Sequence, residues 1–251
     1  MRIIIEANYD EMSKKVSKLI AKHIFYKPRT VLGLATGETP LGMYKELVSL
    51  YDSDLIDFHD ITTFNLDEYL GLDKDNPQSY NYYMHNNLFN HINIPKDNIN
   101  IPLGLATDIA KEAIDYELKI RRIGGIDLQI LGIGRNGHIG FNEPDIKFEA
   151  LTHVVKLDNQ TIEDNSRFFD SMDEVPNQAI SMGIKTIMRA KKIILMASGI
   201  EKADTIRDSI YGNITPTLPA SVLQLHPNVT YILDKAAASK LDLHKTNIDL
   251  L

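Results

Sequence analysis

The sequence of 251 residues predicts an α/β fold in which helices cover both faces of a mostly parallel sheet. Two observations support this prediction. Short apolar, β-branched segments alternate with longer segments of helical periodicity, as in chains that build parallel sheets. The apolar segments are also continuous, which is typical of strands buried on both faces. The six predicted strands cover residues 2–6, 30–34, 61–66, 126–133, 192–197 and 229–233.

Four helices are predicted between these strands. The first covers residues 9–26, and its apolar face consists of Met12, Val16, Leu19, Ile20 and Ile24. Thr39 and Pro40 open the second helix, with the hydroxyl at the N-cap and the proline at the first helical position. The other two cover residues 108–122 and 201–211, and both are followed by glycine.

No internal repeat, low-complexity tract or linker-like segment divides the chain. We therefore predict one doubly wound domain over residues 1–251, with a Rossmann-like αβα arrangement of three layers. Residues 142–173 are less regular than the rest, and a small lid or insertion is expected within them.

Composition indicates a soluble, cytoplasmic protein without nucleic-acid or membrane partners. The formal net charge of −7 argues against nucleic acid, whose phosphates bind to basic surfaces. No apolar segment approaches the roughly 20 residues of a membrane span, and the apolar start is too short for a signal peptide. The absence of cysteine excludes a thiolate nucleophile and a cysteine-built metal site, and it suits the cytosol.

A glycine turn at residues 32–40 joins a predicted strand directly to a helix. Such a turn exposes backbone N–H groups at the positive end of the helix, where an anion can bind. A plain strand-to-helix turn would have the same pattern. Neither the dinucleotide fingerprint G-x-G-x-x-G nor the Walker sequence is present here.

Two adjacent carboxylates, Asp67 and Glu68, follow the third predicted strand. Neighbouring side chains on an extended backbone point in opposite directions, so the two are expected to have different roles. One of them, partly removed from water, could act as a general base with a raised pKa. A solvated acidic turn is the alternative.

The segment 132–144 holds four glycines within nine residues, with His138 among them and Glu143 five residues further on. A carboxylate can fix the tautomer of an imidazole and raise its basicity, as in proton-transferring histidines. This arrangement favours a catalytic role for His138 over a structural one. Arg167 and Lys202 each lie near a turn or helix start, where a phosphate could be bound, although isolated cations are usually solvated.

Together these segments resemble the glucosamine-6-phosphate deaminase family over nearly the whole chain. The resemblance rests on G-L-A-T-G-E-T-P, F-N-L-D-E-Y, G-I-G-R-N-G-H-I-G-F-N-E-P, N-S-R-F-F, S-G-I-E-K-A and L-Q-L-H-P. It implies a hydrolase of amino-sugar catabolism that converts glucosamine 6-phosphate to fructose 6-phosphate and ammonia. Such chemistry needs a base above C1 and C2 of the sugar, but neither a metal nor a cofactor.

The resemblance also implies the roles of single residues. Asp67 matches the base that moves a proton from C2 to C1, and His138 matches the residue that opens the pyranose ring. Glu143 matches the carboxylate that supports this histidine. The implied phosphate ligands are Thr36, Gly37, Thr39, Arg167 and Lys202.

The sequence departs from the family at two positions. Many members have Asp where this chain has Asn136, which can orient His138 but cannot share a charge with it. Glu38 stands where some members have glycine. Because a carboxylate repels phosphate, the Glu38 side chain is expected to point away from the anion site.

Three other functions fit the sequence less well. A 6-phosphogluconolactonase or a non-deaminating isomerase would have less need of Asp67. A sugar-phosphate sensor would require a basic DNA-binding helix, which the sequence lacks. A metal site is not expected, because His85 and His91 are spaced six apart and do not share a helix face. We expect a sugar phosphate as the ligand, and a monomer or a small homo-oligomer.

Overall fold

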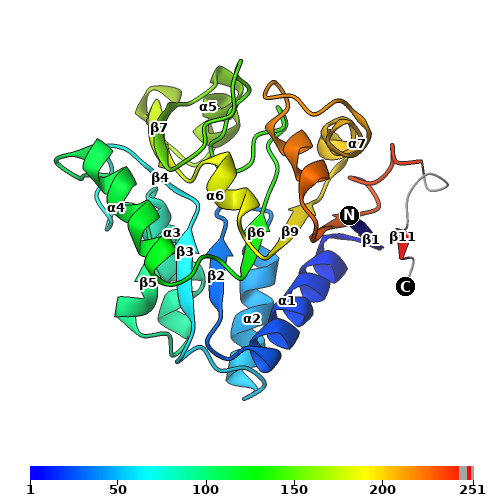
Figure 1. Cartoon of the computed structure of the whole chain (residues 1–251), viewed down its shortest axis with the longest axis horizontal. Helices are drawn as coiled ribbons and strands as arrows, with labels where there is room; N and C mark the ends of the chain where they lie inside the picture. The colour runs from blue at the N-terminus through cyan, green and yellow to red at the C-terminus, as the bar shows by residue number, and fades with distance from the viewer. Residues whose placement is uncertain (243–247, 250–251) are drawn as a thin grey trace.

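The computed structural model describes residues 1–242 and 248–249. Its central feature is an eight-stranded sheet in the order β11-β1-β10-β9-β6-β2-β3-β5, in which every pair of neighbours is parallel (Figure 1). The strands are β1 (Arg2–Glu6), β2 (Val31–Leu34), β3 (Thr62–Asn65), β5 (Ile99–Asn100), β6 (Leu128–Leu131), β9 (Lys192–Ala197), β10 (Val229–Asp234) and β11 (Ile248–Asp249). The predicted parallel sheet is confirmed.

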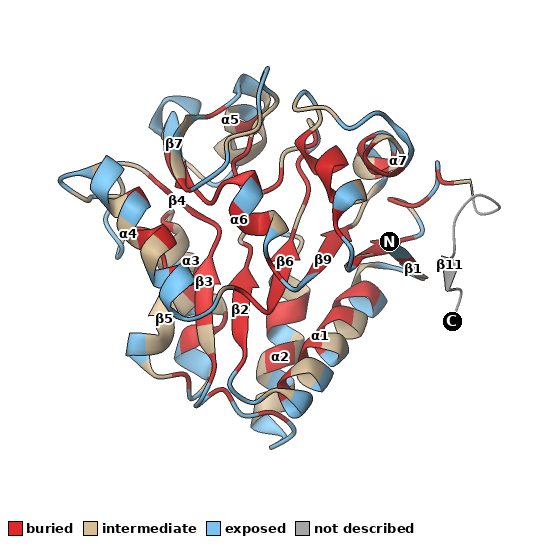
Figure 2. Cartoon of the chain, in the orientation of Figure 1, coloured by how far each residue is buried: buried red, intermediate tan, exposed pale blue. Residues whose placement is uncertain are grey.

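Helices cover both faces of this sheet. One face packs against α1 (Tyr9–Tyr26), α2 (Leu41–Asp52) and α3 (Tyr80–Asn87), and the other against α4 (Ile109–Arg122), α6 (Ile184–Met188) and α7 (Ala203–Tyr211). Figure 2 shows the central strands buried between helices whose outer faces are exposed. Short 3₁₀ helices occur at Phe89–His91, Lys96–Asn98, Met172–Glu174, Ile200–Lys202 and Pro219–Leu225. No helix of the described chain has the length and apolarity that a membrane span requires.

The first and third predicted helices form where the sequence places them, because local signals define their ends. The side chain of Asn8 accepts a hydrogen bond from the amide of Glu11 at the start of α1. Asp108 does the same for Lys111 at the start of α4. Both helices then bury one apolar face, as their periodicity predicts.

The predicted start of the second helix is wrong. Pro40, rather than Thr39, occupies the N-cap position, and α2 has no side-chain cap of its own. The hydroxyl of Tyr9, on α1, accepts a hydrogen bond from the Gly42 amide at 2.8 Å and donates to the Glu38 carbonyl at 2.9 Å. A residue from another helix therefore replaces the expected cap and leaves Thr39 free to face the pocket described below.

The fourth predicted helix also begins later than expected. Residues 200–202 form a 3₁₀ turn, and α7 begins at Ala203. Gly199 has a φ of +97°, which directs the chain sharply out of β9 before the turn. Lys202 consequently lies at the junction between the turn and α7.

A second, antiparallel sheet was not predicted. It consists of β4 (Asp67–Tyr69), β8 (Gln178–Ser181) and β7 (His153–Lys156), and it lies with α5 (Asn159–Ser166) above the main sheet in Figure 1. The chain leaves the main sheet after β3 and enters this second sheet at Asp67. The segment 142–173 thus holds β7 and α5, and its role as a lid remains a prediction.

The topology creates a crevice between β2 and β6. The next strand of this sheet after β2 is β3, on one side, whereas the next after β6 is β9, on the other side. The loops that follow these two strands therefore diverge, and ligands of doubly wound sheets bind at such a switch point, beyond the carboxyl ends of the strands.

At the opposite end of the sheet, Asp127 is a buried anchor. Its carboxylate accepts hydrogen bonds from the Val31 amide and from Lys191, at 2.9 and 2.8 Å, and pairs with Lys27 at 2.5 Å. Burial acts to raise the pKa of Asp127, but the hydrogen bonds from Lys191, Lys27 and Val31 outweigh it and lower the pKa to about 2. The carboxylate therefore stabilises the fold in its charged form.

Replacing Asp127 with Ala should lower the free energy of unfolding by about 2–3 kcal/mol, since the buried Val31 amide loses its acceptor and Lys191 and Lys27 lose their partner. Because the folded-state pKa is depressed, the stabilisation is present above about pH 4 and is lost as the pH falls through about 2. Urea unfolding at neutral pH tests the first point, with Asp75→Ala, at an exposed aspartate, as control. Equal midpoints for the two variants would contradict the anchor role.

Candidate active site

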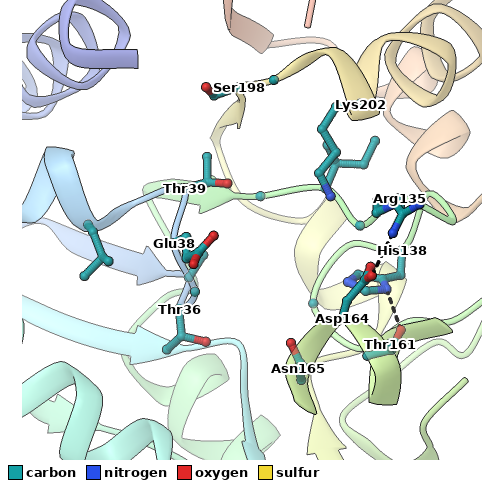
Figure 3. A pocket seen from close by; sticks show the side chains of 18 of the residues that line it. Thr36, Glu38, Thr39, Arg135, His138, Thr161, Asp164, Asn165, Ser198 and Lys202 are labelled. Atoms are coloured by element: carbon teal, nitrogen blue, oxygen red, sulfur yellow. Dashed lines mark hydrogen bonds and ion pairs between the residues drawn. The ribbon is translucent and has the colours of Figure 1, made fainter. Parts of the chain in front are cut away.

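A pocket of about 1190 Å³ lies at the carboxyl ends of the central strands. Most of the predicted site residues line it, namely Thr36, Gly37, Thr39, Asp67, His138, Arg167 and Lys202. In Figure 3, Thr36, Glu38 and Thr39 face Lys202, Arg135 and His138 across the pocket. Asn136 and Glu143 do not line it directly and are instead hydrogen-bonded around His138.

The turn after β2 has fixed carbonyl groups and amides that point to no acceptor in the described protein. Three tyrosine hydroxyls donate to its carbonyl oxygens: Tyr44 to Ala35, Tyr83 to Gly37 and Tyr9 to Glu38. Within the described residues, no amide of residues 36–39 donates a hydrogen bond to the protein. Gly37 has a φ of +96°, which favours glycine. Fixed carbonyls and free amides at a helix start suit a phosphate.

Asp67 is a buried carboxylate on the pocket wall, 5% exposed. Burial is the main cause that raises its pKa, the neighbouring charge of Glu68 adds to it, and together they bring the pKa to about 8. A group with this pKa can release and accept a proton near neutral pH, which is what a general base requires.

Glu68 has a different role, as expected from the extended backbone. Its carboxylate accepts hydrogen bonds from the amides of Tyr69, Tyr80 and Asn81 at 2.8–2.9 Å. These bonds hold the start of α3 and the strand β4 together. Burial raises the pKa of Glu68 to about 7, despite the opposing effect of the three amides. Glu68 is therefore structural and acts on Asp67 only through its charge.

Glycine is required in the loop after β6 because the His138 ring lies against the backbone. A side chain at Gly134 would approach the ring atoms of His138 to 2.5–2.6 Å, closer than real contacts allow. Gly137, with a φ of +88°, packs in the same way against Leu218. Close packing against Gly134 thus restricts the position of the imidazole on the pocket wall.

The imidazole is held by a group of polar side chains. Nδ1 of His138 lies 3.2 Å from Oε2 of Glu143 and 3.3 Å from the hydroxyl of Thr161. Asn136 donates to Oε2 of Glu143 at 2.7 Å and accepts from the His138 amide at 3.1 Å. Burial acts to raise the pKa of Glu143, but the contacts with His138, Thr161 and Asn136 outweigh it and lower the pKa. Glu143 is therefore an ionised acceptor.

The two predicted phosphate-binding cations have different surroundings. Burial lowers the pKa of Lys202, whose side chain points into the pocket in Figure 3. Arg167 is more exposed and forms an ion pair with Glu38 at 2.9 Å. The expectation that Glu38 points away from the site is wrong, since its side chain lines the pocket. The guanidinium of Arg167 compensates its charge and draws it inward.

Sequence reasoning missed the pocket residues that α5 contributes. Thr161, Asp164 and Asn165 all line the pocket. Asp164 pairs with Arg135 at 3.0 Å, and Asn165 donates to the Tyr69 hydroxyl at 2.9 Å. The spacing of three to four residues could have signalled them, because it places these side chains on one helix face. Among the described residues, no group of three or more His, Asp or Glu side chains could hold a metal ion.

Comparison with known proteins shows similarity over nearly the full length. Residues 5–232 match the family described as glucosamine-6-phosphate isomerases/6-phosphogluconolactonase. A glucosamine-6-phosphate deaminase of Clostridium novyi (strain NT) is 63% identical over 241 residues, covering 96% of this chain and 100% of that protein. The deaminase of Clostridium botulinum (strain Okra / Type B1) is 60% identical over 243 residues, covering 97% and 100%.

Solved structures show the same architecture. One, described as a monomeric glucosamine-6-phosphate deaminase, matches with a TM-score of 0.94 and 46% identity, covering 96% of this chain and 100% of that chain. The 6-phosphogluconolactonase of Trypanosoma cruzi matches with a TM-score of 0.77 and 22% identity, covering 96% of both chains. The second likeness is one of fold alone.

Proposed function

Because this chain belongs to the family of glucosamine-6-phosphate isomerases and 6-phosphogluconolactonases, we propose that it converts glucosamine 6-phosphate to fructose 6-phosphate and ammonia. The observation that carries the proposal is the combination, on one pocket, of a buried Asp67, of His138 with Glu143 paired behind it, and of the open amides of the turn at residues 36–39. We assign the proton transfers to Asp67 and His138 and the phosphate to the turn at residues 36–39 with Arg167 and Lys202.

The first step is opening of the sugar ring by His138. The imidazole moves a proton from the anomeric hydroxyl to the ring oxygen, and the C1–O5 bond breaks to give the open-chain aldehyde. Between taking the proton from the anomeric hydroxyl and giving it to the ring oxygen, the imidazole is positively charged. Glu143, an ionised acceptor at Nδ1, stabilises this charge. Asn136 orients Glu143 and the loop but carries no charge, which fits a supporting role.

The next steps belong to Asp67. In its ionised form it removes the C2 proton to give an enolamine, and in its protonated form it returns a proton to C1. Water then adds to the resulting C2 imine, and ammonia leaves from the carbinolamine. The net reaction consumes one water and breaks a C–N bond, so it is hydrolytic. A lactonase, which only hydrolyses an ester, would not need a base that serves two carbons.

A direct assay tests the proposal. The purified protein is incubated with glucosamine 6-phosphate without added metal or cofactor, and ammonia and fructose 6-phosphate are measured. Equal amounts of both products are expected. Fructose 6-phosphate is not formed from 6-phosphogluconolactone, so faster hydrolysis of that lactone, without ammonia from the amino sugar, would favour the lactonase.

The phosphate assignment predicts different effects for the two cations. Lys202→Ala should raise KM for glucosamine 6-phosphate at least roughly 30-fold, because truncating a desolvated charged partner costs about 2–5 kcal/mol. Arg167→Ala should raise KM only several-fold, as expected for about 1 kcal/mol at an exposed site. Steady-state kinetics with glucosamine 6-phosphate and with unphosphorylated glucosamine provide the measurement.

Two comparisons make this prediction specific. Neither variant should change kcat/KM for unphosphorylated glucosamine, and Arg189→Ala, at an exposed arginine outside the pocket, should change neither substrate. A similar loss for both substrates would show that the cations support the fold rather than the phosphate. We further propose that the protein acts in the cytoplasm, because charged sugar phosphates do not cross membranes unaided. We propose a monomer, because the solved structure that is 46% identical to this chain is described as monomeric.

A further inference from the structure

The pocket wall holds a hydroxyl that has no part in the proton transfers assigned to Asp67 and His138. Thr161 lies on α5 and is 2% exposed. Its hydroxyl oxygen is 3.3 Å from Nδ1 of His138, and Figure 3 shows the two side chains joined on the pocket wall. A buried hydroxyl directed at a catalytic histidine has a chemical consequence, because it limits how the ring can be placed.

The hydrogen-bonding capacities of the three groups define their arrangement. The ionised Glu143 can only accept, so Nδ1 of His138 carries the proton and donates to it. The Thr161 oxygen lies 3.3 Å from the same Nδ1, where it is a second acceptor for this N–H. Nε2 then keeps its lone pair and is the nitrogen available to a ligand in the pocket.

We propose that Thr161 is a positioning residue that fixes the orientation and tautomer of His138 for ring opening. A half-turn of the ring would place a carbon against both Glu143 and Thr161 and would remove two hydrogen bonds at once. With Thr161 absent, Glu143 alone holds Nδ1 through one contact of 3.2 Å. Partners of this kind, one contact removed from the chemistry, orient catalytic and metal-binding histidines.

The position of α5 makes this contact dependent on the rest of the pocket. Asp164 and Asn165, one turn further along, contact Arg135 and Tyr69, and Arg167 at the end of the helix pairs with Glu38. The same short helix therefore reaches the proposed phosphate site at one end and the catalytic histidine at the other. Thr161 places His138 correctly only when α5 lies in this position.

Two substitutions separate the hydroxyl of Thr161 from its methyl group. Thr161→Val keeps the shape and removes the hydroxyl, whereas Thr161→Ser keeps the hydroxyl and removes the methyl group. Because the inference rests on the proposed deaminase activity, wild-type ammonia release is measured first. We expect kcat for glucosamine 6-phosphate to fall roughly tenfold or more in Thr161→Val. The kcat of the serine variant should stay within about threefold of wild type. This change is smaller than the factor of ten that corresponds to about 1.4 kcal/mol.

A second readout separates positioning from folding. The acyclic analogue 2-amino-2-deoxyglucitol 6-phosphate needs no ring opening, and calorimetry should give it equal affinities for wild type and Thr161→Val. An unchanged kcat in the valine variant would overturn the inference. So would a larger loss in the serine variant, or a loss of analogue affinity that parallels the loss of kcat. Absence of ammonia release in wild type would instead overturn the proposed function itself.

Discussion

Asp67→Asn is expected to abolish ammonia release while leaving the sugar phosphate bound with nearly unchanged affinity. The amide has the shape of the carboxylate but cannot take the C2 proton, and general-base catalysis contributes roughly 10²–10⁴-fold. Loss of kcat by at least this factor is therefore expected, with the Kd of the acyclic analogue changing little. Near-normal turnover in the variant would remove Asp67 from the mechanism.

The raised pKa of Asp67 adds a second outcome to the same variant. A carboxyl whose folded-state pKa is raised stabilises the fold below its ordinary pKa, and this stabilisation is lost as the pH rises through about 8. The asparagine variant avoids that loss. Its stability advantage over wild type in urea should therefore grow between pH 5 and pH 8 and level off above.

The size of this effect follows from the pKa shift. One pKa unit corresponds to about 1.4 kcal/mol, so even half of the shift from 3.8 to about 8 would make the advantage about 3 kcal/mol at high pH. Glu68→Gln serves as the comparison, because it removes the neighbouring charge and keeps Asp67. Without the charge of Glu68 the pKa of Asp67 should be lower, so the turnover of Glu68→Gln should begin to rise at a lower pH than that of wild type. A pH-independent difference between wild type and Asp67→Asn would contradict the raised pKa.

Local signals in the sequence account for the parts of the fold that were predicted. The continuous apolar segment at 192–197 is a strand in the interior of the sheet. The helix at 9–26 has its own cap and its own apolar face, so its ends need no information from elsewhere. Asp67 and His138 could likewise be placed in the candidate site, because each follows a strand of the main sheet and lies within a distinctive short segment.

The parts that were missed depend on contacts between distant segments. β4 has three residues and becomes a strand only by pairing with β8, far along the chain. The cap of α2 comes from Tyr9 on another helix. The Glu38 side chain lies in the pocket because it pairs with Arg167, a residue whose position depends on α5. Thr161 has an ordinary place in a helix until that helix packs beside His138.

His138→Gln is the other change for which a large effect is expected. Glutamine can still form hydrogen bonds, but it cannot carry a proton between two oxygens. If His138 opens the ring, kcat for glucosamine 6-phosphate should fall roughly 10²–10⁴-fold. The acyclic analogue should bind within about twofold of wild type, a difference of less than 0.5 kcal/mol. His59→Gln, at an exposed histidine outside the pocket, is the control.

The pair with Glu143 sharpens the test. Glu143 acts through His138 at 3.2 Å, so Glu143→Gln should lower kcat in the wild-type background but add little in the His138→Gln background. When two residues act as one unit, removing the second after the first costs little more activity. When they act independently, their losses in activation free energy add. Additive losses in the double variant would show that Glu143 acts on the substrate or the fold by a separate route. Weaker binding of the acyclic analogue to His138→Gln, by the same factor as the loss of kcat, would make His138 a binding residue instead.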